Sequence, residues 1–174
     1  MKAYLRPGFA ALSLAVLSGC ASAPTPPAFC PQVAVLQQAA NLTAFLPGRS
    51  DVAAELTTAH ITGVAGSCAA GGKHLLHVTF KAGFAASNGP ANHAAALTLP
   101  YFVALTQGDT IISKTDYAIT LTFEGNASTA QAVSKPVTVE LANAPASADV
   151  QILVGFALTP AQLSYAAAHP NPGP

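Results

Sequence analysis

Apolar and polar residues alternate at every second position in several segments of this chain, and this alternation constrains the fold more than any other feature of the sequence. In segment 76–84, Leu76, Val78 and Phe80 fall on one face of an extended chain, and His77 falls on the other. A period of two is typical of β-strands with one buried face. The alternation, together with shorter apolar runs, predicts strands at 56–64, 76–84, 100–106, 110–123, 137–141 and 150–158.

Stretches rich in Gly, Asn, Ser and Asp separate the expected strands and predict turns. They occupy residues 66–72, 86–92, 107–109, 125–126 and 143–147. Short strands at this spacing, without a long helix, predict an all-β fold, namely an antiparallel β-sandwich resembling the immunoglobulin or fibronectin type III class. A small barrel is the main alternative.

One short helix is expected near the C-terminus. Thr159 precedes Pro160 and Gln162, which places Thr at the N-cap, Pro at the first helical position and Gln three residues after the cap. This combination is a capping box. The helix should continue through Tyr165, and residues 168–174, which are rich in proline, are expected to form a disordered tail.

The N-terminus combines two basic residues with a short apolar segment. Lys2 and Arg6 precede residues 9–17, which carry no charge. An apolar run of roughly ten residues is about half the length that a membrane-spanning helix needs, and its place after basic residues is typical of a cleavable signal peptide. We therefore expect residues 1–19 to be removed during export.

The four residues Leu17-Ser18-Gly19-Cys20 resemble the bacterial lipobox. This resemblance implies that the thiol of Cys20 receives a lipid and that a peptidase cuts between Gly19 and Cys20, since that peptidase needs small residues before the cysteine. An ordinary secretory signal, cut shortly after Cys20, is the alternative.

The residues that follow Cys20 indicate a destination and a tether. Ala21 stands where an Asp tends to keep lipoproteins in the inner membrane, so the resemblance implies a lipid anchor in the outer membrane and a domain that faces the periplasm. Residues 20–29 contain three prolines and no charge. Such a segment is extended and semi-stiff, at about 3.1 Å per residue, and is expected to hold the domain near the lipid.

Two cysteines remain once Cys20 is assigned to the lipid. After export Cys30 and Cys68 would reach an oxidising compartment, where an even pair of cysteines indicates a disulfide bond. A metal or redox site is the alternative, but the chain has no C-x-x-C pair. Residues 30–167, which begin at the first of these cysteines, are long enough to form one β-sandwich domain with its own core.

Charged residues make up only 8% of the chain, far below the roughly 25% of a typical globular protein. There are seven basic and seven acidic residues, and the loss of Lys2 and Arg6 with the signal leaves a net charge of −2. Because no basic stripe is present, nucleic acid is not an expected partner.

No group of residues predicts a catalytic, cofactor or metal site. His74 and His77 are three positions apart on an expected strand, so their side chains point to opposite faces and cannot share one metal ion. The hydrolase motif G-x-S-x-G is absent and the acidic residues are scattered.

Tyr101 and Phe102 form the one candidate interaction surface. Because they are adjacent in an expected strand, one of the two rings must point away from the core, and exposed aromatic rings often mark a binding surface. The alternative is that the C-terminal helix or the tether covers the outward ring.

Four stretches of the chain contain the two cysteines, the turns, several strands and the capped helix. They read CPQVAVL (30–36), ITGVAGSC (61–68), PYFVA (100–104) and VGFALTPAQL (154–163). Together they resemble a family of small, uncharacterised alphaproteobacterial lipoproteins. These motifs are structural, so the resemblance implies no catalytic residue.

Together these features predict a membrane-anchored bacterial lipoprotein that acts as a non-enzymatic structural or protein-interaction module of the cell envelope. Its expected partners are the membrane, through the N-terminal lipid, and an envelope protein. A periplasmic module that binds a small ligand or glycan is the alternative, and a hydrolase with a site assembled only in three dimensions is a third.

Overall fold

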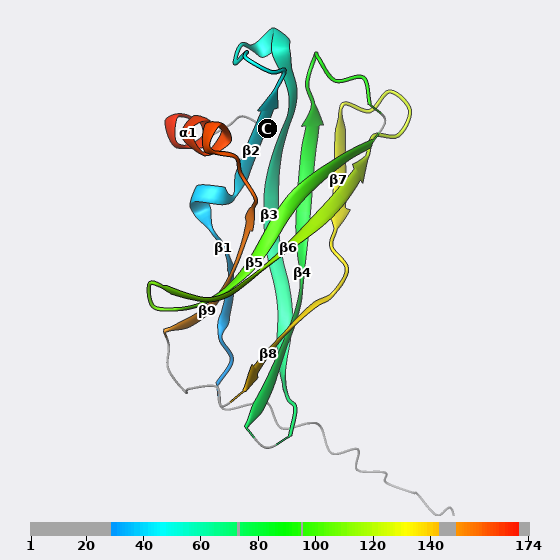
Figure 1. Cartoon of the computed structure of the whole chain (residues 1–174). Coiled ribbons are helices and arrows are strands. Elements are labelled where there is room, and N and C mark those ends of the chain that lie inside the picture. Colours follow the sequence, from blue (N-terminus) through cyan, green and yellow to red (C-terminus); the bar gives the residue numbers. More distant parts are fainter. Residues whose placement is uncertain (1–28, 73, 95, 143–148, 171–174) are drawn as a thin grey trace, which may run out of the picture.

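The computed structural model describes residues 29–72, 74–94, 96–142 and 149–170 (Figure 1). The signal segment, the lipobox and most of the expected tether therefore lie outside the described residues, as do residues 171–174. Among the described residues, no helix has the length and hydropathy needed to cross a membrane.

The strands form two sheets (Figure 1). In sheet A the order is β1 (Gln32–Val35), β9 (Val150–Phe156), β5 (Ala96–Gln107) and β6 (Thr110–Thr122). In sheet B the order is β2 (Asn41–Phe45), β3 (Glu55–Ala70), β4 (Leu75–Asn88) and β7 (Thr129–Val133), and β8 (Val137–Ala142) pairs with the first half of β4.

The described part of the chain is mostly β, with two sheets and one short α-helix, as the alternation and the capping box predicted. The prediction of purely antiparallel sheets is wrong in one place, because β1 pairs with β9 in parallel. The other paired strands are antiparallel. Sheet A is therefore a mixed sheet. Its strand β1 comes from the start of the domain sequence, whereas the neighbouring β9 comes from near its end.

Each strand expected from the alternation is present, but β1, β2 and β7 were not expected. The turn expected at 86–92 is wrong up to Asn88, where β4 ends, and the turn expected at 66–72 is wrong in its first part, because β3 continues to Ala70. Gly66 is paired with Phe80 there, and a Cβ at Gly66 would lie 2.5 Å from the Thr79 carbonyl oxygen. The small residues in this stretch thus allow β3 and β4 to approach closely, and they do not end the strand.

Aromatic rings from both sheets meet in a single core. Phe84 on β4 of sheet B is fully buried, and its ring lies 5.0 Å from Tyr101 on β5 and 5.8 Å from Phe156 on β9. Tyr101 in turn stacks on Tyr117 of β6 at 5.3 Å. The inward faces of the two sheets therefore pack directly against each other.

The C-terminal helix begins as the capping box predicted. In α1 (Pro160–Ala168) the Thr159 hydroxyl accepts a hydrogen bond from the Gln162 backbone N–H, and the Gln162 side chain accepts one from the Thr159 N–H. The helix packs on β2, where the rings of Tyr165 and Phe45 lie 5.0 Å apart. It continues to Ala168, so the first residue of the expected tail belongs to the helix.

Replacement of Phe84 tests this core. Phe84→Ala should lower the free energy of unfolding by about 3–5 kcal/mol, because it removes the ring that contacts β5 and β9 of the other sheet. Denaturant unfolding followed by tyrosine fluorescence measures this change. The exposed Val133→Ala on neighbouring β7 is the control and should shift stability by less than about 0.5 kcal/mol. Equal effects of the two substitutions would show that Phe84 does not hold the sheets together.

Candidate functional site

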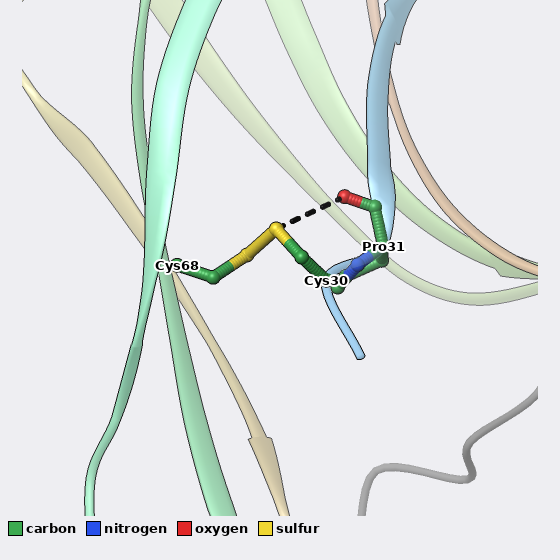
Figure 2. The surroundings of a disulfide bond; sticks show 3 residues. All are labelled: Cys30, Pro31 and Cys68. Atoms are coloured by element: carbon green, nitrogen blue, oxygen red, sulfur yellow. Dashed lines mark hydrogen bonds between the residues drawn. A yellow bond between two sulfur atoms is a disulfide. The ribbon is translucent and has the colours of Figure 1, made fainter. Parts of the chain in front are cut away.

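The two sheets are joined covalently where the chain enters the domain. Cys30 and Cys68 form a disulfide bond with their Cα atoms 5.9 Å apart, which confirms the pairing predicted from the sequence. Figure 2 shows Cys30 just before β1 and Cys68 on β3. Closing the 38-residue separation can stabilise the fold by up to roughly 4 kcal/mol on the chain-entropy model.

The expected cleavage and lipidation residues, Gly19 and Cys20, lie outside the described residues. The structure nevertheless defines where the chain that follows them joins the domain. It enters at Phe29, which packs against the core, and Cys30 then fixes it to sheet B. Any anchor upstream of Phe29 therefore connects to this one end of β1.

Tyr101 lies in the core and does not form part of an exposed surface. It retains only 3% of its accessible surface, because it lies on the inward face of β5 against Phe84 and Tyr117. Burial raises the pKa of its phenol, although a hydrogen bond with the Ser134 side chain acts in the opposite direction. The candidate surface is thus reduced to Phe102.

Phe102 lies on the outer face of sheet A, since side chains alternate along β5. Its ring lies over Gly155 of β9, where an added Cβ would be 2.9 Å from the ring. The ammonium of Lys114 is 4.9 Å from the ring centroid and also lies 3.0 Å from the Asp116 carboxylate. The outward ring therefore has an apolar side toward β9 and a charged neighbour on β6.

A groove of about 540 Å³ opens beside this ring. It lies where the outer face of sheet A meets the short helix η1 (Gln37–Ala39) and α1. The residues that line it are mostly apolar: Leu36, Gln38, Ala39, Phe102, Lys114, Phe156, Ala157, Leu158 and Leu163. The groove can accept apolar side chains or a small apolar molecule, with one ammonium at its margin.

Sequence reasoning found one ring of this groove and missed the rest. Leu36 lies in the loop after β1, far along the chain from Leu158, in the loop before α1, and from Leu163 in that helix. Leu158 ends the alternating segment 150–158, but Leu36 and Leu163 belong to no alternating segment, so no periodic signal could group the three residues. Only the pairing of β1 with β9 brings them to the same face.

A second, polar hollow of about 460 Å³ lies between two loops next to the ends of β4 and β7. Amide and hydroxyl side chains line it, including Asn88, Asn92, Asn126 and Ser128. The Asn88 Oδ1 atom is buried and accepts no hydrogen bond from a described residue.

The two histidines considered for metal binding do not share a site. His74 lies in the turn between β3 and β4, whereas His77 on β4 is 3.4 Å from the Glu140 carboxylate of β8. Within the described part of the chain, no three His, Cys, Asp or Glu side chains come close enough to hold a metal ion.

A double-mutant cycle tests the packing of the groove. Gly155→Ala should cost about 1–3 kcal/mol of unfolding free energy, because the new Cβ would lie 2.8 Å from the Ala39 Cβ as well as against Phe102. The cost should be smaller in a Phe102→Ala background, since part of the clash is removed. A control cycle of Gly155→Ala with Val133→Ala should be additive. Additivity in the Phe102 cycle as well would contradict the contact.

Comparisons of this chain with protein-family models, with curated proteins and with solved structures find no match.

Proposed function

We propose that this protein is a lipid-anchored lipoprotein of the bacterial envelope whose β domain is a non-enzymatic structural or protein-interaction module. The observation that carries the proposal is the disulfide between Cys30 and Cys68. Such bonds form in oxidising compartments outside the cytoplasm. The first of these cysteines follows the lipobox cysteine, Cys20, by only ten residues, so the motif for anchoring and the bond typical of exported proteins are next to each other.

The proposed location is the outer membrane, with the domain in the periplasm. Ala21 after the lipobox cysteine supports this location, because an Asp at that position is associated with the inner membrane. Two or more acyl chains hold a protein firmly at a bilayer, since each buried methylene contributes about 0.8 kcal/mol. The anchor would then need no membrane-spanning segment.

The groove beside Phe102 supports a protein-interaction role. Its lining is mostly apolar, and the one charged group at its margin, Lys114, is already paired with Asp116. Apolar, shallow sites of this kind suit side chains of another protein better than they suit catalysis, which needs converging polar groups. The proposed occupant is an apolar segment of another envelope protein.

A second candidate function is the binding of a small polar ligand, such as a glycan. The observation that favours it is the polar hollow lined by the amide and hydroxyl side chains of Asn88, Asn92, Asn126 and Ser128. Amide and hydroxyl groups without charge are suited to hydrogen bonds with sugar hydroxyls.

We also propose that the two sheets form a sandwich of the immunoglobulin or fibronectin type III kind. Two face-to-face sheets of mostly antiparallel strands support this proposal, as do the connections from β4 to β5 and from β6 to β7, which pass from one sheet to the other.

The anchor is tested by replacing the lipobox cysteine. Mass spectrometry of the mature protein should find an acylated cysteine at the N-terminus. Cys20→Ser should abolish acylation and remove most of the protein from the membrane fraction, whereas Ser18→Ala, which keeps a small residue in the lipobox, should leave both unchanged. An unmodified Ala at the mature N-terminus, or a Cys20→Ser protein that still sediments with the membranes, would overturn the proposal.

A further inference from the structure

The pairing in sheet A brings the start of the domain and one hairpin to the same end. Gln32 at the beginning of β1 is paired with Gln151 of β9, and Gln151 is paired with Thr106 of β5. The turn that follows β5, Gly108–Asp109, lies just beyond this row of residues. The β5–β6 hairpin therefore ends on the side of the domain where the chain enters (Figure 1).

This hairpin exposes two consecutive isoleucines. Ile111 and Ile112 at the start of β6 retain 62% and 53% of their accessible surface, and the whole segment 110–116 is exposed. The other strongly exposed large apolar residues of the described chain stand singly. A lone exposed apolar residue is ordinary on a protein surface, whereas a group of them marks a contact.

We propose that the tip of the β5–β6 hairpin contacts the lipid bilayer, with Ile111 and Ile112 in its interfacial layer. This inference rests on the proposed lipid anchor at Cys20. Gln32 lies twelve positions after Cys20, and an extended chain spans at most about 3.6 Å per residue. The end of sheet A that carries the hairpin is therefore held within roughly 40 Å of the lipid.

A short tether makes a weak contact effective. Linking two binding elements turns the second contact into an intramolecular event with an effective concentration in the millimolar range. Two isoleucine side chains would bind a bilayer poorly from solution, but beside an acyl anchor they need only bias the orientation of the domain.

The charges near the tip decide which lipids it contacts. Asp109 lies in the turn, and the backbone carbonyl of Asp149 accepts a hydrogen bond from the Gly108 N–H, so two acidic residues lie at this end of the hairpin. The nearest described cation on β6, Lys114, is paired with Asp116. The contact is therefore apolar and suits zwitterionic lipid, without attraction to anionic headgroups.

A single labelled thiol tests this contact in the full, acylated protein. The sulfur of Cys20 would be blocked as a thioether, and Cys30 and Cys68 are disulfide-bonded, so Ile111→Cys would supply the one free thiol. The matched control is Val52→Cys. Val52 is 76% exposed and lies just before β3. Cys68, which is bonded to Cys30 where the chain enters the domain, lies near the other end of that strand, so position 52 lies away from the proposed contact. Each variant carries an environment-sensitive fluorophore and is reconstituted into phosphatidylcholine vesicles with brominated acyl chains.

The label at position 111 should shift to shorter wavelength and lose most of its emission to the bromines, while the label at position 52 should behave as in water. Added salt or anionic lipid should not strengthen the quenching. A mass spectrum of each preparation reports the anchor independently, and a mature protein without acyl chains would overturn both the anchor and this inference. Acylated protein with equal, water-like signals at the two positions would overturn the bilayer contact alone.

Discussion

Strand β1 is only four residues long, and its position depends on the covalent bridge between Cys30 and Cys68. The bridge ties the beginning of sheet A to β3 of sheet B, while the strand itself pairs in parallel with β9. Only Val33 and Val35 of this strand pack against the core, and the disulfide reduces the entropy that the strand loses on docking. Once β1 is fixed, the point at which the tether leaves the domain is fixed too.

The functional features follow from this arrangement. The chain continues from β1 into Leu36 and η1, which form one wall of the groove beside Phe102, and α1 forms another wall. The same parallel pairing aligns the start of β1 with the tip of the β5–β6 hairpin. An anchored chain would therefore present the exposed isoleucines toward its anchor and leave the groove on the outer face of sheet A for a partner.

Several of the longer strands could be predicted because they have one buried face. The row Leu76, Val78, Phe80 faces the core and gives a clear period of two. The cysteine pair and the helix cap could also be predicted, since each depends on the residue types at a few positions in the sequence.

By contrast, β1 and β7 contain few large apolar residues, and their positions in the sheets are set by strands that are distant in the sequence. The groove has the same origin, because Leu36, Phe102 and Leu163 meet only after the sheets have assembled. The role of Tyr101 was open for a simpler reason: alternation shows that one of two adjacent rings points outward, but it does not say which.

The most direct test of this account is amide hydrogen exchange in Cys30→Ser/Cys68→Ser compared with the unaltered protein. The informative probe is the Leu36 N–H, which donates to the Val154 carbonyl at 2.8 Å, together with the amides of β1. If the bridge holds the first strand in place, these amides should lose most of their protection in the variant, while those in the centre of β4 remain protected. Unchanged protection of the Leu36 and β1 amides would contradict the account, because the strand would then stay docked without the bond.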